Sequence, residues 1–126
     1  MPTSKPTRLL IADDDPALVE AYVPFFAIHG YAIQTACDGL SALDGYRVWR
    51  PDVVMLDIQM PHMDGWAVAQ EIRGMSVIPP PLLLAVTALS SASDRAKSFN
   101  AGFDLHFVKP AQLSAILAAI AAHTLV

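Results

Sequence analysis

Three short stretches of the chain are apolar at every position, and they predict strands. They cover residues 9–12, 53–56 and 82–86. Unbroken hydrophobicity over so few residues is typical of parallel strands that helices cover on both faces. Segments 31–36 and 105–108 are weaker candidates for two further strands.

Helical patterns fill the intervals between these strands. Asp15 is a favourable N-cap, Pro16 suits the first helical position, and Gly30 marks the end of this first helix. Pro24 lies inside the helix and is expected to kink it. Further helices are predicted over residues 40–49, 65–73 and 91–101. A last helix is indicated by apolar residues three and four positions apart: Leu113, Ile116, Leu117 and Ile120.

Strand and helix thus alternate five times along the chain. This order predicts an α/β fold with a five-stranded, doubly wound parallel sheet and five helices, a flavodoxin-like (βα)5 arrangement. The length of 126 residues fits a single domain, 1–126, in which residues 1–7 form a disordered or extended leader. Because 54% of the residues are hydrophobic, the chain can bury a core without disulfides or a structural metal.

Composition and charge exclude several functional classes. Twelve acidic residues against eight basic ones give a net charge of −4, so we expect no nucleic-acid partner. Cys37 is the single cysteine, which excludes an internal disulfide and a cysteine zinc cluster, and it is interpreted as a small apolar residue. No stretch has the roughly 20 strongly apolar residues of a membrane span, and the polar start lacks a secretory core. We therefore expect a soluble, cytoplasmic protein without a membrane partner.

Polar residues stand at the ends of the predicted strands. Asp13 and Asp14 follow the first strand, Asp57 the third, Thr87 the fourth and Lys109 the fifth. In open α/β sheets the ligand site lies beyond the carboxyl ends of the strands, so these residues are expected to meet at one edge. Each of them alone could be a helix cap or a solvated charge, but their joint occurrence predicts a site.

The chemistry of this set favours a metal and a phosphoryl group. Three carboxylates in one pocket repel one another, and a hard divalent cation relieves that repulsion. Mg²⁺ prefers oxygen ligands and often holds a phosphoryl group beside one or two carboxylates. Lys109 offers a positive charge and Thr87 a hydroxyl to phosphoryl oxygens. An ionised aspartate in such a site is a nucleophile for phosphorus, so the residues predict phosphoryl transfer to a carboxylate.

Several motifs occur in a fixed order, and they cover nearly the whole chain. They are residues 9–16, 52–57, 60–65, 87–88, 101–104 and 109–110. Together they resemble a response-regulator receiver domain of two-component signalling, the CheY-like superfamily. The resemblance implies that Asp57 is the phosphoacceptor. It also implies that Asp14, Asp57 and the backbone carbonyl of Gln59 bind Mg²⁺ directly, with Asp13 acting mostly through water.

The resemblance extends to the phosphoryl group and a switch position. It implies that Thr87, Lys109 and the backbone amide of Ala88 contact the phosphoryl group, and that the Lys109–Pro110 bond is cis. His106 stands three residues before Lys109, where the family usually has a switch aromatic. Two interpretations of His106 stay open: a switch partner that moves with Thr87, or a polar residue of an edge strand.

Three features away from the acids have simpler interpretations. Trp66 begins a predicted helix and is taken as a packing residue, and His62 is taken as a surface residue. Residues 110–126 contain no Asp, Glu, Lys or Arg. An uncharged outer helix face suits a partner. We expect a downstream protein to dock on the face formed by 91–101, 105–108 and 110–126, with weak homodimerisation as a further expectation.

The sequence is therefore interpreted as a signalling module rather than an enzyme. It takes a phosphoryl group onto Asp57 from a histidine kinase or a histidine phosphotransfer protein, with Mg²⁺ as cofactor, and switches a partner-binding surface. The alternative is a small Mg²⁺-dependent phosphohydrolase that forms an aspartyl phosphate. That class needs an acid two residues after the nucleophile, where this chain has Gln59. A nucleotide- or flavin-binding domain is disfavoured because the acids after the first strand would repel phosphate.

Overall fold

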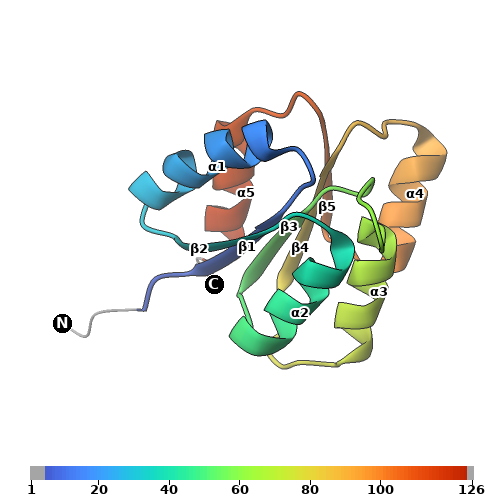
Figure 1. Ribbon diagram of the computed structural model, residues 1–126, viewed down its shortest axis with the longest axis horizontal. Coiled ribbons are helices and arrows are strands. Elements are labelled where there is room, and N and C mark those ends of the chain that lie inside the picture. The colour runs from blue at the N-terminus through green and yellow to red at the C-terminus, as the bar shows by residue number, and fades with distance from the viewer. Residues whose placement is uncertain (1–4, 125–126) are drawn as a thin grey trace.

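Five parallel strands form one sheet within the described part of the chain, which in this computed structural model comprises residues 5–124 (Figure 1). The strand order is β2-β1-β3-β4-β5, and each neighbouring pair is parallel. The strands are β1 (Arg8–Ala12), β2 (Ala32–Ala36), β3 (Val53–Leu56), β4 (Leu82–Thr87) and β5 (Leu105–Val108). The helices are α1 (Pro16–Ile28), α2 (Gly39–Trp49), α3 (Gly65–Gly74), α4 (Ala92–Ala101) and α5 (Leu113–Thr124). The predicted doubly wound α/β fold is confirmed.

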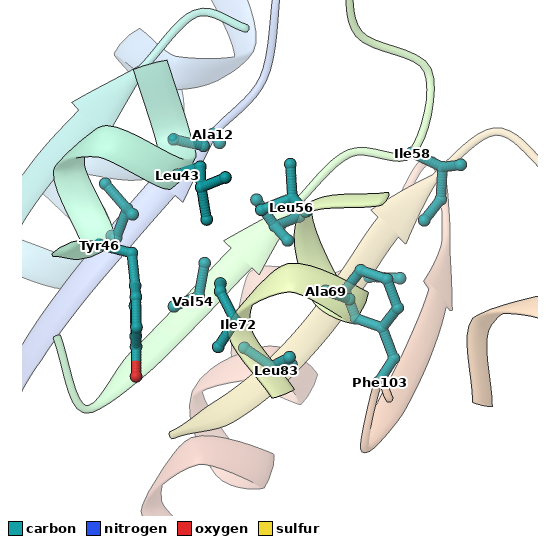
Figure 2. Packing of buried hydrophobic residues seen from close by; sticks show 14 of the residues in the cluster. Ala12, Leu43, Tyr46, Val54, Leu56, Ile58, Ala69, Ile72, Leu83 and Phe103 are labelled. Atoms are coloured by element: carbon teal, nitrogen blue, oxygen red, sulfur yellow. The ribbon is translucent and has the colours of Figure 1, made fainter. Parts of the chain in front are cut away.

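The helices cover both faces of the sheet, with α1 and α5 on one face and α2, α3 and α4 on the other (Figure 1). Successive strand residues point to opposite faces. In β1, Leu9 and Ile11 therefore pack with α1 and α5, whereas Leu10 and Ala12 pack with the other three helices. Figure 2 shows the second of these cores, in which Tyr46 of α2 lies beside the strands. Burial on both faces explains why the strands read as unbroken apolar runs.

Polar caps begin the helices where the strand-end loops turn back. The Asp15 carboxylate accepts the Ala17 N–H at the start of α1, as predicted, and Asp38 and Asp64 cap α2 and α3 in the same way. Ser91 is the N-cap of α4 and forms a reciprocal capping box with Asp94. Each cap satisfies a backbone donor that the first helical turn leaves free.

A few boundaries differ from those predicted. Thr87 is the last residue of β4 rather than the residue after it, because the ladder between β4 and β5 extends to the pair Thr87 and Val108. The predicted leader lies outside the described residues at positions 1–4, and residues 5–7 precede β1 without helix or strand. The Lys109–Pro110 bond is cis, as the resemblance implied, and so is Ile78–Pro79. No helix in residues 5–124 has the length and hydropathy that a membrane span requires.

Gly65 sets how closely α3 approaches the end of β3. Its N–H donates to the carbonyl of Ile58, with 2.8 Å between nitrogen and oxygen. A Cβ atom at Gly65 would lie 2.4 Å from the carbonyl oxygen of Asp57 and 2.9 Å from the Cα of Ile58. Both are backbone atoms, which cannot turn aside as a flexible side chain can. The first turn of α3 therefore fits against the Asp57 backbone only without a side chain at this position.

We expect Gly65→Ala to destabilise the fold by about 1–3 kcal/mol, the usual cost of forcing an extra carbon into a close-packed site. Urea unfolding measures this free energy. Gly74→Ala is the matched control, because Gly74 lies at the other end of α3 and a Cβ there has no atom within 4 Å. The control should be neutral or stabilising by up to about 1 kcal/mol. Equal stability of the two variants would contradict this account of Gly65.

Candidate functional site

The carboxyl ends of β1 and β3 bring three aspartates together. Asp13 and Asp14 follow β1 and Asp57 follows β3, as predicted. One carboxylate oxygen from each lies within 4.8 Å of those of the other two. Asp13 and Asp57 are buried, with 3% and 7% of their surface exposed, whereas Asp14 is exposed. The site thus has two buried acids and one that faces solvent.

Lys109 joins the two buried acids across the sheet. It follows β5, and its Nζ donates to Asp13 Oδ2 and to Asp57 Oδ2, each at 2.8 Å. Burial alone would lower the pKa of Lys109, but the hydrogen bonds and charges of the two carboxylates hold it above its ordinary value. The ammonium is therefore charged near pH 7.

Burial also raises the pKa of Asp13 above its usual range, and the neighbouring charge of Asp57 adds to that rise. Hydrogen bonds from Lys109 and from the backbone N–H of Asp15 act in the opposite direction. When all groups are ionised, three carboxylates and one ammonium leave two negative charges. Oxygen donors with this surplus suit a hard divalent cation.

A cleft of about 540 Å³ opens beside Asp13 and Asp14. It is bounded by the start of α1 and by the loop after β2, including Cys37. The thiol of Cys37 is exposed, so this residue is not part of the apolar core. The acidic pocket is therefore open to solvent and to a partner on this side.

The remaining predicted residues lie around the same edge. Thr87 is fully buried at the end of β4, and Ala88 follows it in the exposed loop. The backbone N–H of Gln59 donates to Asp57 Oδ1 at 3.3 Å, while the Gln59 side chain is exposed. The residues proposed from the sequence thus gather at one edge of the sheet. His106 is the exception, because it pairs with Ala85, two residues before the end of β4.

His106 belongs to the edge strand β5 but points into the protein. It is only 8% exposed and pairs in register with Ala85, two residues before Thr87, so its side chain and that of Thr87 share one face of the sheet. Its Nδ1 lies 2.8 Å from Ser98 Oγ, and its Nε2 lies 2.8 Å from the carbonyl oxygen of Leu89. His106 is thus a polar residue of the edge strand, as one of the two open interpretations had it, but it is buried and hydrogen-bonded; its role as a switch stays a prediction.

Sequence reasoning missed Ser98 and the polar role of Trp66. Trp66 does more than pack, because its Nε1–H donates to Ser98 Oγ at 3.0 Å. Lys97 lies over the Trp66 ring, 5.3 Å from its centroid. The buried residues of α4 are Ser98 and Ala101, three positions apart. That spacing is the one signal that could have marked Ser98 as inward-facing.

Comparison with known proteins connects this geometry to one family. The family model described as "Response regulator receiver domain" matches residues 9–121. The chain is 39% identical over 113 residues to "Response regulator MprA" of Mycobacterium sp. (strain KMS), a match that covers 90% of this chain and 48% of that protein. The MprA protein of Mycobacterium tuberculosis (strain ATCC 25618 / H37Rv) is likewise 39% identical, over 111 residues. The chain therefore spans about half the length of these curated relatives.

Solved structures share this fold. A CheY-like receiver domain from Methanospirillum hungatei JF-1 superposes with a TM-score of 0.87 at 24% identity, covering 94% of this chain and 93% of that one. The signal receiver domain of the putative response regulator NarL from Mycobacterium tuberculosis superposes with a TM-score of 0.86 at 26% identity, covering 95% and 97%. A chain of the CheX–CheY–BeF₃–Mg complex from Borrelia burgdorferi superposes with a TM-score of 0.87 at 27% identity, covering 96% and 91%.

We expect Lys109→Met to destabilise the fold by about 3 kcal/mol near pH 7 without added divalent cations. The change leaves Asp13 and Asp57 buried together without a counter-charge. Urea unfolding provides the measurement, with Lys5→Met as the control because Lys5 is exposed and precedes β1. A Lys109→Met protein as stable as the Lys5→Met protein would show that the ammonium does not hold the two acids in place.

Proposed function

This chain belongs to the response regulator receiver domain family, and from that premise we propose that Asp57 accepts a phosphoryl group from a histidine kinase or a histidine phosphotransfer protein. The observation that carries the proposal is the contact of Lys109 with both Asp57 and Asp13, beside a third acid. In the transfer, an oxygen of Asp57 forms a bond to phosphorus while the bond from phosphorus to the donor nitrogen breaks. The donor imidazole leaves with the electron pair of that bond.

Receiver domains of this family typically bind Mg²⁺ at an acidic pocket, and the aspartate cluster fits that ion by its donor chemistry. We propose that Asp14, Asp57 and the backbone carbonyl of Gln59 hold Mg²⁺ directly, and Asp13 through water. The ion would neutralise charge on Asp57 and on the phosphoryl oxygens. The Borrelia burgdorferi complex, which is described as containing BeF₃ and Mg, supports this combination of ligands for a related fold.

Lys109, Thr87 and Ala88 are proposed to bind the phosphoryl group itself. Lys109 Nζ lies 2.8 Å from Asp57 Oδ2, so a phosphoryl oxygen on Asp57 would be within its reach. Thr87 is the last residue of β4 and Ala88 follows it. Because β4 lies between β3 and β5, both residues are at the same edge of the sheet as Asp57 and Lys109. With His106 on the same face as Thr87, movement of the Thr87 hydroxyl toward the phosphoryl group is proposed to change the space available to the imidazole.

The phosphohydrolase alternative is not favoured. The family model and the curated relatives describe response regulators, which are signalling regulators rather than enzymes. The general acid that such a hydrolase needs would stand at Gln59, whose side chain is a neutral amide.

The output is proposed to be a protein contact on the face formed by α4, β5 and α5. The family implies a histidine kinase and a downstream target as partners. The sequence of α5 contains no Asp, Glu, Lys or Arg, and Phe99 on α4 is 52% exposed. Burying α5 therefore removes no hydration from acidic or basic side chains of that helix, which favours docking or weak self-association there.

We expect Asp57→Asn to fold and to take no detectable phosphoryl group from acetyl phosphate with Mg²⁺, because an amide is a poor nucleophile. Intact-protein mass spectrometry measures the labelling. Asp44→Asn is the control, since its side chain is 79% exposed on α2, and it should be labelled like the unaltered protein. Normal labelling of Asp57→Asn would show that another residue is the acceptor.

We also expect weak self-association that beryllofluoride with Mg²⁺ strengthens. Ala118 is exposed on α5, and Ala118→Glu should lower the association constant about tenfold because it puts a charge into the interface. Sedimentation equilibrium measures the constant. Val48→Glu on α2, at a position that is 88% exposed, should leave it unchanged. A protein that stays monomeric at high concentration would refute self-association and leave the heterologous partner as the output.

A further inference from the structure

Four hydrogen bonds form a continuous chain between α3 and the end of β4. Trp66 Nε1–H donates to Ser98 Oγ, Ser98 Oγ contacts His106 Nδ1, and His106 Nε2 contacts the carbonyl of Leu89. The Leu89 N–H then donates to Thr87 Oγ1 at 3.3 Å. We call Trp66, Ser98, His106, Leu89 and Thr87 the Ser98 chain.

Two partners whose role cannot change, the indole of Trp66 and the carbonyl of Leu89, fix the direction of the bonds between them. An indole N–H can only donate, and a carbonyl oxygen can only accept. His106 Nε2 therefore carries a hydrogen toward Leu89, and in the tautomer with this single N–H the acceptor is Nδ1. The Ser98 hydroxyl accepts from Trp66 and donates to His106 Nδ1. Each hydrogen then has one acceptor, which assigns the Nε2–H tautomer to His106.

Burial makes this chain strong and its loss costly. Ser98 and Thr87 are fully buried, and His106 is 8% exposed. Within the described residues no buried side-chain nitrogen or oxygen lacks a partner. Removing the Ser98 hydroxyl would leave both Trp66 Nε1–H and His106 Nδ1 without theirs. The penalty of desolvation falls mainly on His106 Nδ1, whose bond to Ser98 is buried, whereas Trp66 is only half-buried.

We propose that Ser98 is a positioning residue, which holds His106 inward and thereby fixes the loop after β4 in the form that receives a phosphoryl group. All members of the chain are groups of the protein itself, so the inward position of His106 is stabilised by α3 and α4 rather than by a ligand. Thr87 Oγ1 accepts from Leu89, which leaves its own hydrogen free to donate to a phosphoryl oxygen. This inference rests on the proposed function, because the phosphoryl group is the ligand that the loop would bind.

The expected consequence is a preformed phosphoryl site. The apparent affinity of a ligand falls in proportion to the fraction of protein in the competent state. Ser98→Ala should lower that fraction and so weaken the binding of beryllofluoride about fivefold to tenfold, the effect of losing the one hydrogen bond that holds His106. The affinity for Mg²⁺ alone should stay unchanged, because the acids belong to the loops after β1 and β3. If Ser98 had only a structural role, Ser98→Ala would weaken the binding of both ligands or of neither.

Isothermal titration of the full chain with Mg²⁺, and with beryllofluoride at saturating Mg²⁺, tests this split. Ser93→Ala removes an exposed hydroxyl from the same helix and should bind both ligands like the unaltered protein. Trp66→Phe keeps a ring but removes the N–H. It should also weaken the binding of beryllofluoride, but less than Ser98→Ala does. Beryllofluoride affinity in Ser98→Ala equal to that in Ser93→Ala would overturn the proposal.

A second measurement needs no variant and therefore does not depend on Ser98→Ala folding. Long-range ¹H–¹⁵N spectra of the imidazole in the unaltered protein should show Nε2 protonated and Nδ1 free of hydrogen. A ring protonated at Nδ1 alone would leave no hydrogen between Nε2 and the carbonyl of Leu89, which would break the Ser98 chain and overturn the proposal. If the unaltered protein binds Mg²⁺ but no beryllofluoride, the proposed function fails instead, and the tautomer alone decides whether the Ser98 chain exists as assigned.

Discussion

The contact of one ammonium with two buried carboxylates is the constraint on which the rest of the structure depends. Lys109 lies 96 positions from Asp13 and 52 from Asp57 along the chain, yet it donates to both. It can do so only where β1, β3 and β5 end at one edge of the same sheet. A buried charge without its partner costs several kcal/mol. The acidic pocket and the strand order therefore depend on each other.

The register of the strands depends on the same contact and on the apolar faces. A shift of one residue in β1 would exchange Leu9 and Ile11 with Leu10 and Ala12 between the two cores. It would also displace Asp13 from the ammonium. Gly65 adds a third restraint, because α3 lies directly against the backbone of Asp57. Hydrophobic packing, charge and steric fit thus all select the same arrangement around Asp57.

Most of the fold and the composition of the acidic pocket follow from local features of the sequence. Unbroken apolar runs mark strands that are covered on both faces, and residues directly after parallel strands must share an edge. That reasoning reaches Asp13, Asp57 and Lys109 without any knowledge of side-chain positions. It reaches Asp15 as a helix cap for the same reason, since the cap and its helix are adjacent in the sequence.

The sequence is less informative wherever a side chain's direction depends on distant packing. The short edge strand 105–108 has no clear alternation, so nothing in it tells whether His106 points outward or inward. Arg73 shows the same limit. It donates to the carbonyls of Gly102 and Pro81 and to the Asp104 carboxylate, and these contacts exist only once α3, β4 and the loop before β5 are assembled. Such contacts are set by tertiary structure rather than by a pattern along the chain.

Thr87 is the residue at which the charged and the neutral hydrogen-bond systems meet. Its carbonyl accepts the backbone N–H of Lys109 at 2.8 Å, and its hydroxyl accepts the N–H of Leu89. Thr87 is therefore bonded both to Lys109 of the acidic pocket and to the loop that contacts His106, and three hydrogen bonds connect its hydroxyl to Ser98 of α4. A ligand shifts such an equilibrium only by its differential affinity for the two states. Because the bonds of Ser98 already favour one of them, a phosphoryl group on Asp57 would act on a loop whose position α3 and α4 have largely determined.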